Sequence, residues 1–123
     1  GCGDVISVAC PMFVPLAENG YTSVNQIPAL EIAREYLAPV ADTCPDAVIL
    51  GCTHYPFLAG VITKVANALT PSRKVSIIDP APAVARHLHE VMHEEHTIKR
   101  EGFSLSLHAS GDISVLNDMA GRL

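Results

Sequence analysis

One segment of the sequence combines a thiol with an imidazole two residues further on. Cys52 and His54 follow Gly51 at the end of the apolar run 47–50, and Pro56 comes next. This order is typical of a buried strand that leads through a turn into a helix. A thiol at such a turn lies near unpaired backbone N–H groups, which favour the thiolate. In an extended segment His54 can exchange a proton with the thiol, and Gly51 leaves room for a substrate. The spacing predicts a reactive thiol and leaves the reaction open; the alternative is a small, buried apolar cysteine.

A second segment has the spacing of a metalloprotease zinc site. The run His89-Glu90-Val91-Met92-His93 fits the pattern H-E-x-x-H, and His96 could be a third ligand. At about 100° per residue, however, these histidines lie on a different helix face from the apolar stripe that starts at Val84. His96 also stands where the longer metzincin pattern requires glycine. We therefore expect a solvated helix face and no metal, with a zinc metalloprotease as an alternative.

The elements that position these residues follow from short apolar runs that alternate with helical patterns. Alternation of strands and helices predicts an α/β fold with a parallel sheet, whose functional loops follow the carboxyl ends of the strands. Pro28, Pro56 and Pro82 suit first helical turns, and Asp112 favours the start of the last helix. The predicted strands are 5–9, 47–50, 75–79 and 103–108, and the predicted helices are 28–37 (ending near Pro39 or in the Pro45 loop), 57–69, 82–92 and 113–120.

Composition narrows the class of protein. Of the 123 residues 49% are hydrophobic and 17% are charged, which is typical of a globular chain. Eight basic against thirteen acidic residues give a net charge of −5 with no basic stripe, so we expect no nucleic-acid partner. No apolar run is long enough to span a bilayer and no secretory signal is visible, so we expect no membrane partner. The four cysteines form no C-x-x-C pair, which favours reduced thiols in the cytoplasm over a disulfide framework.

The segment Leu50-Gly-Cys-Thr-His-Tyr-Pro56 resembles, almost letter for letter, the signature around the second catalytic cysteine of the glutamate racemases. Three further segments are similar to that family: 9–18, 78–86, and 109–112 together with the final helix. The resemblance covers nearly the whole chain. It implies a parallel-sheet sandwich of the aspartate/glutamate racemase type, present here only in part as its C-terminal half.

The resemblance also implies an activity. Glutamate racemases interconvert L- and D-glutamate without a cofactor, and the D-glutamate supplies cell-wall peptidoglycan. Two cysteines face opposite sides of the α-carbon, where one thiolate removes the proton and the other thiol delivers one. Such general acid–base chemistry needs groups of matched proton affinity, which two thiols provide. The expected partner is the small-molecule substrate glutamate.

Site residues carry over individually from the resemblance. Cys52 is the expected acid/base for the L-enantiomer, and His54 would tune it and help to hold the substrate. Thr53 would bind a substrate carboxylate through its hydroxyl and backbone N–H, and Glu18 matches an auxiliary carboxylate. The alternatives are a structural histidine, a capping threonine and a solvated glutamate. Cys10 lies in a similar segment, and we expect it to be buried for packing.

Family members are roughly twice as long, and their first half supplies the other cysteine and an Asp-Ser-Gly turn. Neither feature occurs in these 123 residues, and the sequence starts without methionine, so an upstream segment is expected. By the family pattern, residues 1–74 form most of the second lobe with Cys52, and residues 75–123 return to a first lobe whose N-terminal half is absent. We therefore expect a fragment with half an active site that is inactive as a racemase alone. Bare strand edges would favour self-association, and hence a homo-oligomer.

Two further functions stay open. Aspartate and hydantoin racemases look similar around the second cysteine, although they usually lack the His-Tyr-Pro continuation found at residues 54–56. A non-catalytic fragment could also retain the motif. An upstream Asp-Ser-Gly turn and Cys-Asn-Thr would favour the enzyme.

Overall fold

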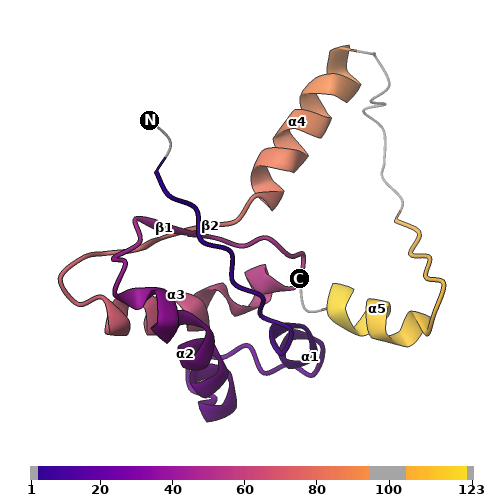
Figure 1. The fold of residues 1–123 in the computed structure, drawn as a ribbon. Coiled ribbons are helices and arrows are strands. Elements are labelled where there is room, and N and C mark those ends of the chain that lie inside the picture. Colours follow the sequence, from indigo (N-terminus) through magenta and orange to yellow (C-terminus); the bar gives the residue numbers. More distant parts are fainter. Residues whose placement is uncertain (1–2, 95–104, 122–123) are drawn as a thin grey trace. The chain divides into compact units, whose positions relative to one another are not determined.

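The computed structural model describes residues 3–94 and 105–121, and the chain divides into two compact units, Gly1–Ala81 and Pro82–Leu123 (Figure 1). In chain order the elements are α1 (Phe13–Glu18), α2 (Ile27–Ala41), β1 (Ala47–Ile49), the short 3₁₀ helix η1 (Tyr55–Leu58), α3 (Ala59–Leu69), β2 (Ser76–Ile78), α4 (Ala81–Glu94) and α5 (Ile113–Ala120).

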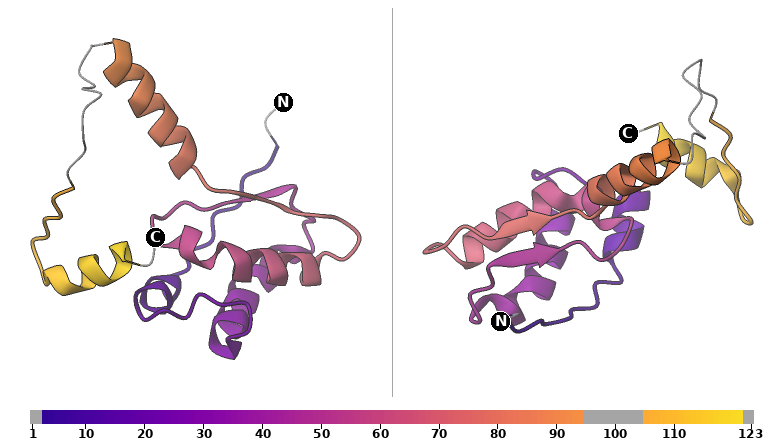
Figure 2. Two further views of the ribbon diagram at one scale, coloured as in Figure 1. Left: turned by 180° about the vertical axis from the view of Figure 1, so that it is seen from behind. Right: turned by 90° about the horizontal axis from the view of Figure 1, so that it is seen from above.

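The two strands of the first unit form a parallel pair, which confirms the predicted α/β class. Val48 lies opposite Ile77 in the register. The ladder continues past β1, where the Leu50 N–H donates to the Ile78 carbonyl oxygen at 2.9 Å. Helices α2 and α3 lie on the same side of this sheet (Figures 1 and 2). A parallel pair needs a crossover connection, and η1 with α3 provides it.

The core of the first unit lies where α2, α3 and the sheet meet. Helix α3 contributes Val61 and Ile62, which are 0% and 1% exposed, at its contact with α2. The facing positions of α2 are Ala29 and Ala33, both fully buried. Because alanine side chains are short, the two helix axes can approach closely while the larger side chains of α3 fill the space between them.

The helical predictions agree with the structure in their main spans. Helix α2 has Pro28 in its first turn, as expected, and it continues through Pro39 to Ala41. The chain then turns at Cys44, whose φ of 49° is in the left-handed region. The predicted helix after Pro56 is divided into η1 and α3.

The predicted strand over residues 5–9 is wrong. These residues are without strand pairing, and Val5 and Ile6 are 91% and 54% exposed. An apolar run forms a strand only where a neighbouring strand accepts its hydrogen bonds, and in the described part of the chain the sheet consists of β1 and β2. The predicted strand over 103–108 falls partly outside the described residues, and residues 105–108 are not in a strand.

The second unit contains α4 and α5. The side chains of α4 from residue 81 to 93 are exposed, including Val84 and Leu88 at 66% and 56%. Helix α5 begins as predicted, because the Asp112 carboxylate accepts a hydrogen bond from the Ser114 N–H at 2.9 Å. This bond lowers the pKa of Asp112. Among the described helices, none combines the length and apolar character needed to cross a bilayer.

Candidate active site

Cys52 lies just beyond the carboxyl end of β1, where parallel sheets place their functional loops. Leu50, only 2% exposed, fixes the end of the strand in the core, and the chain leaves the sheet at Gly51. The Cys52 carbonyl oxygen then accepts a hydrogen bond from the Tyr55 N–H at 3.1 Å, which closes the turn into η1. This turn leaves the thiol half-buried. A Cβ added at Gly51 would meet no atom within 4 Å, so the backbone beside the thiol is open.

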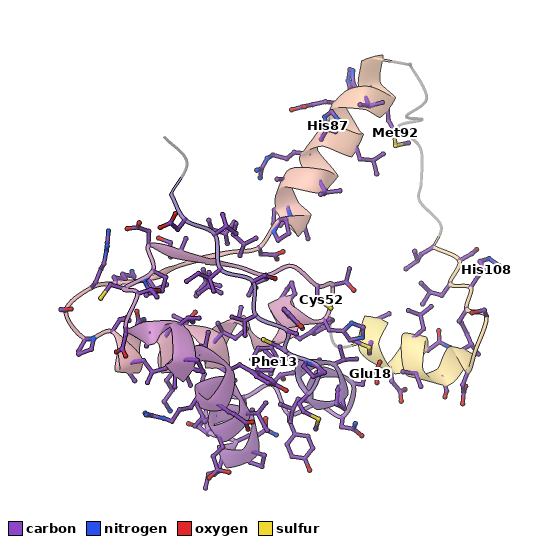
Figure 3. The ribbon with its side chains drawn as sticks, in the orientation of Figure 1. Phe13, Glu18, Cys52, His87, Met92 and His108 are labelled. Carbon is purple, nitrogen blue, oxygen red and sulfur yellow. The ribbon has the colours of Figure 1, made fainter. Side chains whose placement is uncertain are left out.

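A thiol, an imidazole and a carboxylate lie in a row at this turn. The Sγ of Cys52 is 3.9 Å from Nδ1 of His54, and Nε2 of the same ring is 3.3 Å from Oε1 of Glu18. Figure 3 shows the Cys52 and Glu18 side chains in the same region of the first unit. Cys52 lies in the turn before η1, and Glu18 is the last residue of α1. The side chains of His54 and Glu18 are 26% and 39% exposed, so solvent screens this pair in part.

The row has a chemical direction. An ionised Glu18 can only accept, so its bond to His54 requires the imidazole proton on Nε2. In the neutral ring Nδ1 then carries a lone pair, and Nδ1 is the atom beside the Cys52 sulfur. This arrangement can take a proton from the thiol and return it. The structure thus brings together three of the four predicted site residues, and it places Thr53 between Cys52 and His54 with an exposed side chain.

Helix α1, which carries Glu18, was missed by the sequence analysis. Its six residues are too short for a clear helical period, although Phe13, Leu16 and Ala17 have helical spacing and are all buried. Tyr55 was interpreted only as part of the turn, and it also contacts this helix. Its hydroxyl donates to the Cys10 carbonyl oxygen at 3.1 Å, one turn before α1.

The other cysteines have different environments. Cys10 is buried, as expected, and burial raises the pKa of its thiol. Burial is also the main cause of the raised pKa of Tyr55, to which the nearby Cys10 and Cys52 thiols add. Cys44 is exposed, and all three described cysteines are free thiols.

The H-E-x-x-H segment lies on α4 with exposed side chains. The rings of His89 and His93 are 5.8 Å apart, and Glu90 lies near His87 instead, with 3.8 Å between Oε2 and Nδ1. Across residues 3–94 and 105–121, no group of three or more His, Cys, Asp or Glu side chains could hold a metal ion. His96 falls outside the described residues.

Fold and site together define a class: part of an α/β protein with a thiol and an imidazole side by side at the carboxyl end of a parallel strand. No protein-family model matches the chain. Curated relatives do, among them the glutamate racemase of Carboxydothermus hydrogenoformans, 36% identical over 116 residues, or 94% of this chain and 41% of the relative.

Solved structures give the same result. The glutamate racemase of Thermus thermophilus in complex with β-chloro-D-alanine is 37% identical, with a TM-score of 0.71 over 94% of this chain and 42% of that one. The glutamate racemase of Francisella tularensis in complex with D-glutamate is 32% identical. Its TM-score is 0.66, and the match covers 80% of this chain and 34% of that one. The chain is thus related to the glutamate racemases over nearly its whole length and matches their C-terminal part. It spans about two-fifths of the length of the first of these relatives.

Proposed function

We propose that the protein to which these residues belong interconverts L- and D-glutamate. The observation that carries the proposal is the Cys52–His54–Glu18 row at the end of β1, in a chain that matches glutamate racemases over 94% of its residues. The α-proton of an amino acid is weakly acidic, so its removal needs a base held directly beside it. A thiolate with an adjacent imidazole meets this need.

In the proposed reaction the Cys52 thiolate takes the α-proton of L-glutamate and becomes a thiol. The electron pair stays on the α-carbon and its carboxylate as a planar carbanion. A second thiol, which the family resemblance assigns to the other half of the enzyme, delivers a proton to the opposite face and becomes a thiolate. The product is D-glutamate, and the reverse reaction starts with the two cysteines in exchanged protonation states.

The neighbours of Cys52 have distinct proposed roles. His54 takes the thiol proton on Nδ1 and so generates the thiolate, while Glu18 keeps the ring in the required tautomer; the 3.9 Å and 3.3 Å separations support both roles. Thr53 binds a substrate carboxylate through its hydroxyl and backbone N–H, for which its exposed position is suited. The open space at Gly51 supports a close approach of the substrate to the backbone.

The same proposal covers the protein's wider setting. Residues 1–74 belong to the lobe that carries Cys52, and residues 75–123 return to the lobe with the second cysteine. The D-glutamate serves peptidoglycan synthesis. The reaction takes place in the cytoplasm, where thiols remain reduced, and the free thiols of Cys10, Cys44 and Cys52 agree with this setting.

Circular dichroism of glutamate during incubation with the whole protein tests the proposal. Either pure enantiomer should proceed to the racemic mixture, and Cys52→Ser should slow the reaction by about a hundredfold or more, because a hydroxyl is a much weaker acid than a thiol. Cys44→Ser, the same change at an exposed cysteine, should leave the rate unchanged. A folded, reduced protein that racemises aspartate but not glutamate would refute the glutamate assignment.

A further inference from the structure

We infer that Tyr55 is a positioning residue: its hydroxyl holds helix α1 in the place where Glu18 meets His54. The inference rests on the proposed function, since it concerns how the Cys52–His54–Glu18 row is assembled. Tyr55 is the residue next to His54, and it contacts the segment that leads into the helix of Glu18.

The contacts form a closed circuit. The Cys10 carbonyl oxygen accepts two hydrogen bonds, from the Phe13 N–H at 3.1 Å and from the Tyr55 hydroxyl at 3.1 Å. The first of these bonds forms the turn that starts α1. Glu18 ends the same helix and contacts His54, which precedes Tyr55 in the chain. The start of α1 is therefore fixed by one residue of the η1 turn, and its end contacts the neighbouring residue of that turn.

Aromatic packing fixes the direction of the helix within this circuit. Phe13 is 2% exposed, and its ring packs edge-to-face against two tyrosine rings. The ring centroids are 5.3 Å apart for Tyr55 and 5.2 Å apart for Tyr36 of α2. The Tyr36 hydroxyl accepts a hydrogen bond from the Met12 N–H at 3.1 Å. Edge-to-face pairs depend on ring orientation, so two such contacts restrict rotation of the helix about Phe13.

A six-residue helix has little stability of its own. Its orientation must therefore come from these contacts. If the Tyr55 hydroxyl is removed, the Cys10 carbonyl retains its bond to Phe13 and the ring contact with Phe13 remains, but the hydrogen bond from the turn that carries Cys52 is lost. The predicted consequence is a longer or more variable His54–Glu18 separation, and with it weaker support for the tautomer that has its lone pair at Nδ1 beside the thiol.

The test is the rate at which iodoacetamide alkylates Cys52 in the whole protein, followed by mass spectrometry of its peptide between pH 6 and pH 9. Tyr55→Phe keeps the ring and removes the hydroxyl. It should slow the alkylation of Cys52 at pH 7 by about fivefold, the factor expected for one hydrogen bond, and move the pH profile toward that of Glu18→Gln. Tyr36→Phe should act in the same direction.

Two controls separate positioning from a general loss of structure. Tyr21→Phe makes the same chemical change at a residue that is 42% exposed. It should leave the alkylation rate of Cys52 unchanged. Alkylation of the exposed Cys44 should be equal in all variants, while fast labelling of the buried Cys10 would report unfolding. If Tyr55→Phe unfolds by this criterion, Tyr36→Phe alone decides the test.

The double variant Tyr55→Phe/Glu18→Gln identifies the route. If Tyr55 acts through Glu18, the double variant reacts no more slowly than Glu18→Gln alone; losses that multiply would overturn the inference. Suppose that Cys52 is alkylated in Tyr55→Phe at the wild-type rate at every pH, while it is alkylated slowly in Glu18→Gln. This result would refute the positioning role of Tyr55 and leave the proposed function intact. If Glu18→Gln itself reacts as wild type, both the positioning role and the proposed role of Glu18 are wrong.

Discussion

Cys10 and Cys52 carry the same side chain in opposite environments. Cys10 is 8% exposed, and its Sγ lies 3.6 Å from the Val8 carbonyl oxygen, to which the thiol can donate. Cys52 is half-buried at the end of β1, with an imidazole nitrogen as its neighbour. Burial without a cation favours the neutral thiol, whereas a neighbouring base can take its proton. Residue type alone does not distinguish the two cysteines, and position in the fold does.

The raised pKa of Cys10 predicts a loss of stability in alkaline solution. As pH rises through the ordinary thiol pKa, the unfolded chain releases the Cys10 proton first and the folded chain keeps it. The contribution of this group is therefore fully present below that pKa and declines until the folded thiol also ionises. Urea unfolding at several pH values should show a steeper alkaline decline in wild type than in Cys10→Ala. Equal slopes would contradict the effect of burial; both proteins are compared in a Tyr55→Phe background, because Cys10 also helps to raise the pKa of Tyr55.

Thr53 provides a second prediction at this scale. Removal of its hydroxyl in Thr53→Val should raise KM for glutamate by about fivefold to tenfold with a smaller change in kcat, because a carboxylate contact is present in both substrate and transition state. Thr53→Ser keeps the hydroxyl and should retain the wild-type KM. Steady-state kinetics with both enantiomers measure this. A Thr53→Val enzyme with an unchanged KM would show that the hydroxyl does not bind substrate.

At the scale of elements, α3 carries two of the largest fully buried side chains of the described residues, Val61 and Ile62. Ile62 is 1% exposed, so Ile62→Ala should lower the free energy of unfolding by about 2–5 kcal/mol. Ile27, at the start of α2, is 66% exposed, and Ile27→Ala should cost less than about 0.5 kcal/mol. Chemical denaturation of both variants of the whole protein tests the difference. Similar losses would mean that the core is not centred on α3.

Most of the helices and both strands could be predicted from local sequence patterns. Helices α2, α3 and α4 each extend over eleven or more residues and were expected close to their observed spans. Helix α1 has six residues and was missed, because its position depends on the distant aromatic rings of Tyr36 and Tyr55. The prediction of a strand at 5–9 was wrong, because an apolar run does not show whether a neighbouring strand is available to pair with it.

The residues of the candidate site also differ in how far local sequence predicts them. The pairing of Cys52 with His54 could be predicted, since both residues lie in one turn. Glu18 was named only from the family resemblance, because thirty-six positions separate it from His54. No local pattern brings residues so distant together, and their contact follows from the packing of α1 against η1.

At the scale of the whole molecule, the described chain leaves much apolar surface uncovered. In the first unit Ile49 and Ile78, which face each other in the sheet register, are 66% and 44% exposed. In the second unit Val84 and Leu88 of α4 are 66% and 56% exposed. Patches of this kind mark surfaces that bind other protein. The relatives are more than twice as long as the matched segment, so each of them contains further residues outside the part that matches this chain.

The isolated 123 residues should therefore self-associate. Multi-angle light scattering is expected to give a mass above the 13.1 kDa of one chain, rising with concentration. Ile78→Lys should lower the association, because a charge on an exposed strand opposes edge pairing. Lys64→Arg, a conservative change at an exposed position, serves as the control. A monodisperse monomer at all concentrations would contradict the prediction.

The central claim is that Cys52 acts on one face of the α-carbon of glutamate. Proton NMR in heavy water tests it most directly, with separate samples of L- and D-glutamate and the whole, reduced protein. The wild-type protein should exchange the α-proton of both enantiomers for deuterium. Cys52→Ser should lose exchange with L-glutamate and retain exchange with D-glutamate, whose proton the other thiol removes. Equal exchange of both enantiomers by Cys52→Ser, or none by the folded wild-type protein, would contradict the claim.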